Sequence, residues 1–273
     1  MSVQNFIPTL WSARLLANLD KAHVFGNIVN RDYEGEIKQA GDRVKINQMG
    51  DVTIGDYDGT DIADAEELTS AQKELLIDQA KYFNFQVDDV DQAQANVTLM
   101  DKGMQRASVA FAEVVDKAIA EKYVEAGSQI GDDTTPVALT AENVYDQMVD
   151  LSVALDEKNA PREGRYVVVP AFVHGLLLKS DAFVSANNEV AKKGLVGQVA
   201  GFDVYVSNNV AKVDEGFKIM GGTPDAITMA EQILEVEAYR PEKRFSDALK
   251  GLHVYGIAVT QPDALAVLTA TKG

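Results

Sequence analysis

Four carboxylates between residues 56 and 67 have the spacing of a metal-binding loop. In the stretch DYDGTDIADAEE, four of the ligand positions of a calcium-type loop are filled by Asp56, Asp58, Asp64 and Glu67. The glycine, however, comes two positions too early, and strand-like sequence flanks the loop where helices are needed. We therefore interpret this stretch as a solvated acidic loop tip, and weak Ca²⁺ or Mg²⁺ binding is the alternative.

The other residue types that carry chemistry form no catalytic pattern. Dozens of residues separate the three histidines from one another, and no HxxxH or HExxH arrangement includes His23, His174 or His253. No GxSxG motif is present, and the glycine-rich stretch MGGTPDA lacks the GKS or GKT ending of a phosphate-binding loop. We expect structural roles for the histidines, a turn at MGGTPDA, and neither enzymatic activity nor a cofactor.

Composition excludes several classes of protein. The chain has 273 residues and a formal net charge of −17, whereas a nucleic-acid reader needs a basic face that displaces counterions. It contains no cysteine, which removes disulfides, thiolate nucleophiles and cysteine-based zinc sites and is typical of a reducing cytoplasm. No apolar run approaches the ~20 residues that span a bilayer, and no signal-peptide pattern is present. We expect a soluble globular protein.

Charge is distributed unevenly along the chain. Residues 51–72 contain seven acids and no Lys or Arg. Residues 238–251, AYRPEKRFSDALKG, form a basic cluster that includes Arg240, Lys243 and Arg244. Such a cluster could hold phosphate or nucleic acid, but it more often pairs with acids on a partner surface.

Two polar, strand-like stretches predict one long β-hairpin over residues 33–87. In the first stretch, YEGEIKQAGDRVKINQMGDVTIGDYDG, the period of two places Val44 and Ile46 on one face. In the second, ELLIDQAKYFNFQV, one face is shared by Ile77, Phe83, Phe85 and Val87. An isolated two-stranded ribbon is marginally stable in water, and this one is mostly polar. We therefore expect another copy of the protein to supply the missing surface.

The clearest helix is predicted over residues 88–126, where apolar or small residues recur every three or four positions. Asp89 and Gln92 would cap its start, and Gly127 would end it. Its length would be on the order of 55 Å. Gly103 inside it costs roughly 1 kcal/mol relative to alanine, so we expect a bend or a close approach there.

An N-terminal arm and an α/β region complete the order of elements. Residues 1–32 carry aromatic side chains, which indicates an arm that lies on another surface. After a turn-rich boundary at 128–139, Thr140 is predicted to cap a helix that carries Val144, Met148, Leu151 and Leu155. A buried strand RYVVVP, a helix at 171–179 and the strands GFDVYVSNN, GFKIM and ILEVEAY follow. The last 24 residues are strand-like, with a turn at 261–263.

This order of elements resembles the major capsid proteins of tailed double-stranded DNA bacteriophages, which have the Hong Kong 97-type fold. The resemblance is carried by NFIPTLWSARLLANLDKAHVFGNIVNRDY, GDRVKINQMGDVTIGDYDG and LEVEAYRPEKRFSDALKGLHVYGIAVTQPDALAVLTAT. It implies an α+β fold with four parts. These are an N-terminal arm (1–32), an extended β-hairpin loop (33–87), a peripheral domain with a long spine helix (88–131 and 246–273) and an α/β axial domain (132–245).

The function that the resemblance implies is shell building. Pentamers and hexamers of the chain would form an icosahedral phage head around double-stranded DNA, without sequence-specific DNA binding. The hairpin would reach over an adjacent subunit. The interface between subunits is predicted to include Trp11, Arg14, Asp56, Tyr57, Asp61, Glu66, Phe83, Phe85, Arg240, Lys243 and Arg244.

Further partners and the location also follow from the resemblance. The arm is only about 30 residues long, so we expect a separate scaffolding protein, and a portal protein as a further partner. The loop tip contains no lysine, so we expect no covalent crosslink of the kind that some relatives form. The protein would be made in the cytoplasm of a host bacterium and would end in the virion, with no membrane contact.

Two alternatives remain open at this point. The first is an encapsulin-like shell of a cellular nanocompartment, which would have the same fold. The second is a soluble enzyme or binding module, which would form a small, discrete oligomer. Particle size separates the second alternative from both shell hypotheses.

Overall fold

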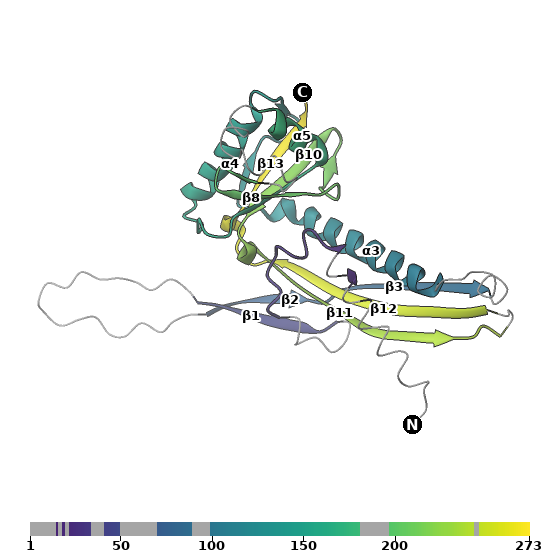
Figure 1. Cartoon of the computed structure of the whole chain (residues 1–273). Helices are drawn as coiled ribbons and strands as arrows, with labels where there is room; N and C mark the ends of the chain where they lie inside the picture. Colours follow the sequence, from purple (N-terminus) through teal and green to yellow (C-terminus); the bar gives the residue numbers. More distant parts are fainter. Residues whose placement is uncertain are drawn as a thin grey trace, which may run out of the picture.

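The chain has a mixed α/β fold with few helices and several sheets. A computed structural model describes residues 15, 18–19, 22–33, 41–49, 70–88, 99–180, 197–242 and 246–273. Within these ranges, an upper part built on an eight-stranded sheet stands above an elongated lower part (Figure 1). No helix in the described ranges is long and apolar enough to cross a membrane.

The lower part is built on a three-stranded antiparallel sheet, here called the long sheet. Its strands follow the order β11 (Ile227–Tyr239), β12 (Ser246–Val259) and β3 (Gln79–Asp88). Alternate residues of a strand point to opposite faces. Along β3, accordingly, Phe83, Phe85 and Val87 are half-buried, whereas Tyr82 and Asn84 are exposed. The shared face predicted for these three residues is therefore confirmed. Ile77, predicted on the same face, is instead buried under the ribbon with Val44 and Ile46.

Helix α3 (Leu99–Ala120) packs along one face of the long sheet (Figure 1). Its 22 residues span about 33 Å, and a short 3₁₀ helix, η3 (Glu121–Glu125), continues it. The predicted cap at Asp89 and Gln92 lies outside the described residues. A Cβ atom at Gly103 would lie 2.6 Å from Cε2 of Phe85, so the close approach expected at this glycine is confirmed.

The buried face of α3 explains why this segment is helical. Residues that recur every three or four positions turn toward the sheet and bury Met104, Phe111, Val115 and Ile119. The hydroxyl oxygen of Ser108, on the same side, lies 3.0 Å from the carbonyl oxygen of Met104 and 3.3 Å from that of Leu15. The helix therefore contacts both the long sheet and Leu15.

The upper part contains the eight-stranded sheet, here called the upper sheet. Six of its strands lie in the order β4 (Ser128–Ile130), β13 (Leu265–Lys272), β10 (Gly216–Gly222), β6 (Tyr166–Val169), β8 (Phe202–Val206) and β7 (Gln198–Val199). Two short strands complete it, β5 (Val137–Leu139) beside β13 and β9 (Lys212–Val213) beside β10. All four residues of β6 are buried, as the run RYVVVP predicted.

Helices α4 (Val144–Glu157) and α5 (Ala171–Lys179) pack on the upper sheet. The predicted buried face of α4 is confirmed, because Val144, Met148, Leu151 and Leu155 are fully buried. The predicted cap is wrong. The residue at the start of α4 is Asn143, whose side-chain oxygen accepts the N–H of Thr140 over 2.8 Å. An asparagine three positions later thus replaces Thr140 at the helix start.

A two-stranded ribbon, β1 (Arg43–Met49) with β2 (Ser70–Leu76), lies on the other face of the long sheet. Val44, Ile46, Leu75 and Ile77 pack there against Ala230 and Val254. The prediction of a single hairpin through residue 87 is wrong at its second arm, since β2 ends at Leu76 and β3 pairs with β12. Between β2 and β3 the chain crosses directly over Gly256 of β12. A Cβ atom at position 256 would collide with the carbonyl oxygen of Leu76.

The two sheets are joined by a pair of similar turns. The 3₁₀ turn η4 (Pro224–Ala226) connects β10 to β11, and η5 (Pro262–Ala264) connects β12 to β13. The sequence analysis ended the axial domain at residue 245 and resumed the peripheral domain at residue 246. This boundary assigned β11 to the axial domain and β13 to the peripheral domain. The pairing corrects both assignments, because β11 joins the long sheet and β13 joins the upper sheet.

Candidate assembly surface and its buried anchor

Most of the predicted interface lies outside the described residues. This applies to Trp11, Arg14, Asp56, Tyr57, Asp61, Glu66, Lys243 and Arg244, and to the metal-ligand candidates Asp56, Asp58, Asp64 and Glu67. In the part of the chain that the structure describes, no group of three or more His, Cys, Asp or Glu side chains could hold a metal ion. Arg240 is exposed directly after β11. These interface assignments stay predictions.

Phe83 and Phe85 pack between the long sheet and α3 within one chain. Their rings stack with centroids 5.7 Å apart, and the ring of Phe83 also lies 5.6 Å from that of Phe111. Both belong to an apolar cluster that includes Leu15, Met104, Val236 and Leu249. They therefore face the long helix, and their predicted contact with a neighbouring subunit stays a prediction.

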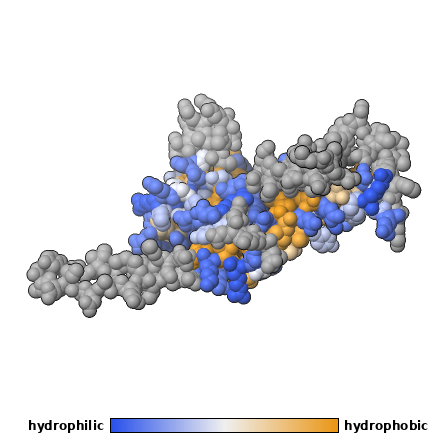
Figure 2. Space-filling model, turned by 90° about the horizontal axis from the view of Figure 1, so that it is seen from below, coloured by the Kyte–Doolittle hydropathy of each residue, from blue (hydrophilic) through white to orange (hydrophobic). Residues whose placement is uncertain are grey.

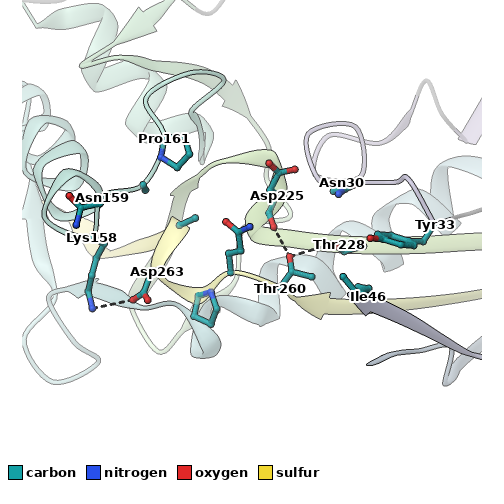
Figure 3. Close-up of a pocket in the computed structure, with 14 residues that line it drawn as sticks. Asn30, Tyr33, Ile46, Lys158, Asn159, Pro161, Asp225, Thr228, Thr260 and Asp263 are labelled. Atoms are coloured by element: carbon teal, nitrogen blue, oxygen red, sulfur yellow. Dashed lines mark hydrogen bonds and ion pairs between the residues drawn. The ribbon is translucent and has the colours of Figure 1, made fainter. Parts of the chain in front are cut away.

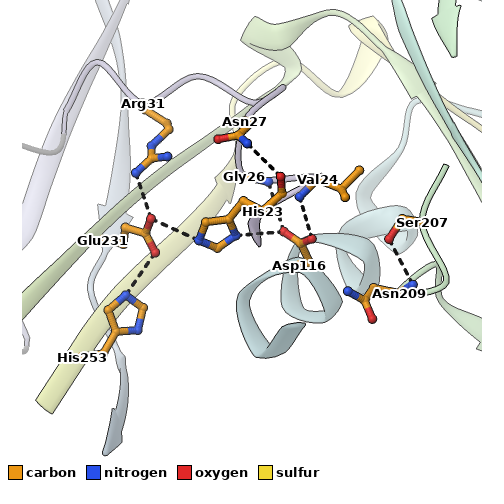
Figure 4. Close-up of polar contacts among 10 residues, drawn as sticks. All are labelled: His23, Val24, Gly26, Asn27, Arg31, Asp116, Ser207, Asn209, Glu231 and His253. Atoms are coloured by element: carbon orange, nitrogen blue, oxygen red, sulfur yellow. Dashed lines mark hydrogen bonds and ion pairs between the residues drawn. The ribbon is translucent and has the colours of Figure 1, made fainter. Parts of the chain in front are cut away.

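A buried polar cluster joins four segments that are far apart in the sequence (Figure 4). Glu231 of β11 lies at its centre. One of its carboxylate oxygens is 2.8 Å from Nη2 of Arg31 and 3.3 Å from Nε2 of His23, and the other is 3.0 Å from Nε2 of His253. The contact between Glu231 and His23 has an ion-pair distance without hydrogen-bond geometry. Two of the three histidines thus converge on a single carboxylate.

Asp116 of α3 anchors the segment that carries His23. It lies 3.1 Å from Nδ1 of His23 and accepts the backbone N–H groups of Val24, over 2.9 Å, and Gly26, over 3.2 Å. Both carboxylates are almost fully buried. Because a buried charge without partners is costly, these contacts hold residues 23–31 against α3 and β11.

The buried charges shift the pKa values of both central groups. Burial alone would lower the pKa of His23, but its contacts with Asp116 and Glu231 outweigh this and raise it to about 9. Burial would raise the pKa of Glu231, but its contacts with His23 and His253 outweigh it and lower the pKa to about 2. At neutral pH, His23 is therefore a cation held between two carboxylates.

No sequence motif pointed to this cluster. We predicted a separate structural role for each histidine, and no motif links His23 to His253 across the length of the chain. A signal that could have found it is the run of polar residues inside otherwise apolar strands, where Glu231 and His253 stand on facing strands of the long sheet.

A polar groove of about 610 Å³ lies where the two parts of the molecule meet (Figure 3). Thr228 and Thr260 lie on one wall with their hydroxyl oxygens 3.3 Å apart. Lys158, at the end of α4, forms an ion pair with Asp263 of η5 over 3.1 Å. The Thr hydroxyls and the Lys158–Asp263 pair thus make up part of a polar lining at the junction of the two parts.

Comparison with known proteins agrees with this architecture. The sequence profile of the phage capsid protein family matches residues 72–268. A solved structure from Mycobacterium phage Che8 is 31% identical, with a TM-score of 0.73 and coverage of 90% of each chain. No curated protein sequence matches the chain.

More distant solved structures share the fold. The capsid of the cyanophage P-SCSP1u is 16% identical, with a TM-score of 0.67 and coverage of 92% of this chain and 87% of that one. A virus-like particle from Pyrococcus furiosus is 14% identical, with a TM-score of 0.60 and coverage of 96% and 99%. The family match and the 31% identity together identify the chain: it belongs to the phage capsid protein family and is a major capsid protein.

Proposed function

We propose that this chain builds the icosahedral head of a tailed phage, as pentamers and hexamers in the Hong Kong 97-type arrangement. The observation that carries the proposal is the family match over most of the chain, combined with a ribbon whose root, at Val44, Ile46 and Leu75, packs on the long sheet. In this arrangement α3 is the spine helix of a peripheral domain, and the upper part is the axial domain. The β1–β2 ribbon is the base of the extended loop.

The shell encloses double-stranded DNA without reading its sequence. The net charge of −17 supports this, because an acidic protein does not bind DNA tightly through its backbone. Portal and separate scaffolding proteins are the further partners, the virion is the final location, and synthesis takes place in the cytoplasm of the host. The protein has no enzymatic role in this proposal.

The encapsulin-like alternative receives no separate support. The Pyrococcus furiosus particle matches at 14% identity, which indicates a shared fold alone. The 31% identity to the Mycobacterium phage Che8 structure favours the phage head.

Electron microscopy of the purified protein tests the proposal. We expect closed particles of tens of nanometres, alone or after addition of a scaffolding protein. A stable monomer or small oligomer under both conditions would contradict it. A denaturing gel of mature particles should show one band at 29.6 kDa, because no covalent crosslink is expected.

A further inference from the structure

The two faces of the long sheet are covered differently. Seen from below, the lower part shows apolar surface between hydrophilic areas (Figure 2). Helix α3 lies along the upper face of the sheet (Figure 1), and its exposed side carries charges of both signs. Because single surface charges are ordinary in proteins, only the order of these charges along the helix can point to a partner.

One ridge of α3 points directly away from the long sheet. At 3.6 residues per turn, Arg106, Val109, Ala110 and Glu113 lie within about 100° of one another, on the side opposite the buried residues of the helix. All four side chains are exposed, and that of Val109 is 43% exposed. These four residues are here called the outer ridge of α3.

The outer ridge carries opposite charges at equal distances from its centre. Arg106 lies three residues before Val109, and Glu113 lies three residues after Ala110. The charged residues are therefore about 10 Å apart along the helix axis. Neither forms an ion pair or hydrogen bond with another residue that the structure describes. A two-fold axis through the centre would thus place each Arg106 beside the Glu113 of a second copy.

We propose that the outer ridge of α3 binds the same ridge of a second copy across a two-fold axis, and that this contact joins neighbouring rings of the shell. The inference rests on the proposed shell function and adds to it the contact between rings. Within a closed ring of five or six copies, each copy contacts the next through two different surfaces. A self-complementary surface instead suits a two-fold contact, which can connect one ring to another.

Helix packing limits the length of this contact. Two helices whose ridges interdigitate commonly cross at about 50°, with axes about 8–10 Å apart. The short side chains of Val109 and Ala110 permit this approach at the crossing point. Lys102 and Lys117 lie on the same side of α3 but roughly 11 Å from the centre along the axis. Since the helices diverge from the crossing point, these like charges stay outside the contact.

The charges of the outer ridge select the partner more than they strengthen the contact. Exposed ion pairs add little affinity, whereas like charges placed opposite each other suppress binding strongly. The two-fold axis doubles either effect, because the contact contains the pair of Arg106 and Glu113 twice. Reversal of one charge should therefore be much more damaging than its removal.

The first test reverses these charges one at a time and then together. Arg106→Glu should lower the yield of closed particles on the order of tenfold, while free pentamers and hexamers accumulate. Glu113→Arg should have the same effect, and the double variant should restore the yield. Lys102→Glu is the matched control, because it changes the charge of the same side of α3 outside the contact. Its particle yield should stay unchanged.

Three results of this test would overturn the contact. The first is a normal particle yield with both single variants. The second is a double variant that does not recover, although its far-ultraviolet circular dichroism spectrum is that of the unmodified chain. The third is an equal loss with Lys102→Glu, since the yield would then follow the net charge of the chain.

The second test uses the absence of native cysteine. Val109→Cys would bring two copies of one cysteine together near the two-fold axis, so oxidised particles should give a crosslinked dimer on a non-reducing gel. The matched control is Val124→Cys, because Val124 is 66% exposed on η3 and lies roughly 20 Å further along. It should stay at the monomer mass of 29.6 kDa.

The outcomes separate the contact from the shell function. Intact particles that give only monomer with Val109→Cys, or as much dimer with Val124→Cys, would overturn the contact and leave the shell function standing. Failure of the unmodified chain to form particles would instead overturn the shell function.

Discussion

The upper and lower parts of this capsid protein bury their apolar residues in different ways. In the upper part, one continuous apolar cluster joins α4 and α5 to the upper sheet. In the elongated lower part, three separate small clusters lie under the ribbon, between α3 and the long sheet, and around Phe111. The polar cluster around Glu231 lies among them. A further large cluster joins residues 25–29, α3 and the long sheet to β6, β10 and β13 of the upper sheet, so the two parts share a core where they meet. Away from that junction, the lower part is held by the three smaller clusters and leaves Tyr82 exposed.

The strongest test of this difference removes the apolar cluster between α3 and β3. Replacing Phe83 and Phe85 together with serine should cost on the order of 5 kcal/mol, because both rings are half-buried against α3. Hydrogen exchange should rise in α3 and β12 and stay unchanged in β6, and fewer particles should form. The reciprocal variant, Leu151→Ala, should loosen the upper part first. Equal loss of protection in both parts for either variant would contradict the division.

Removing the anchor carboxylate should have the next largest effect. Asp116→Ala leaves His23 and the N–H groups of Val24 and Gly26 without their acceptor, at a cost of about 3–5 kcal/mol. Limited proteolysis should then cut the segment around residues 23–31. Asp156→Ala, which removes a partly exposed carboxylate from the upper part, should leave that segment resistant. Equal cleavage of both variants would contradict the anchor.

A change of pH should weaken the same anchor by a smaller amount. The contribution of His23 is complete below its unfolded pKa of 6.5 and is lost as pH rises through about 9. That of Glu231 is complete above 4.5 and is lost as pH falls toward about 2. Protection of the Val24 and Gly26 amides, corrected for intrinsic exchange, should therefore be greatest between pH 4.5 and 6.5.

Two comparisons decide the pH prediction. In His23→Gln, the loss of protection between pH 6.5 and 9 should disappear, and the amide of Val168 in the upper sheet should show no such loss in either protein. Protection of Val24 that stays constant from pH 6 to 10 in the unmodified chain would contradict the role of His23.

The smallest effect is expected at the surface of the ribbon. Arg43 and Glu74 form an ion pair over 2.9 Å, but their side chains are 64% and 46% exposed. Arg43→Ala should therefore change the free energy of unfolding by about 0–1 kcal/mol, which thermal denaturation can measure. A larger loss would show that the ribbon depends on charge pairing at its root more than on Val44 and Ile46.

The sequence predicted local structure better than it predicted which strands pair. The faces of β3, α3 and α4, the buried strand β6 and the close approach at Gly103 all follow from periodicity and residue size. The change of sheet after Leu76 and at the Pro-Asp-Ala turns does not, because strands on both sides of each change have similar apolar patterns. The convergence of His23, Asp116 and Glu231 depends on tertiary packing and leaves no trace in spacing.

The paired Pro-Asp-Ala turns have a mechanical consequence for a container wall. Where the turns pass each other, the N–H of Thr223 donates to the carbonyl oxygen of Ala264 over 3.1 Å. The N–H of Thr260 donates to the carbonyl oxygen of Ala226 over 2.9 Å. Two turns that are hydrogen-bonded to each other share tension. A force that separates the upper part from the lower part therefore loads both turns at once. A third crossing, from η3 to β4, lies beside them, since the N–H of Gly127 donates to the carbonyl oxygen of Pro262 over 2.8 Å. Pressure from inside a filled head would thus be resisted at this junction by three neighbouring segments of the chain.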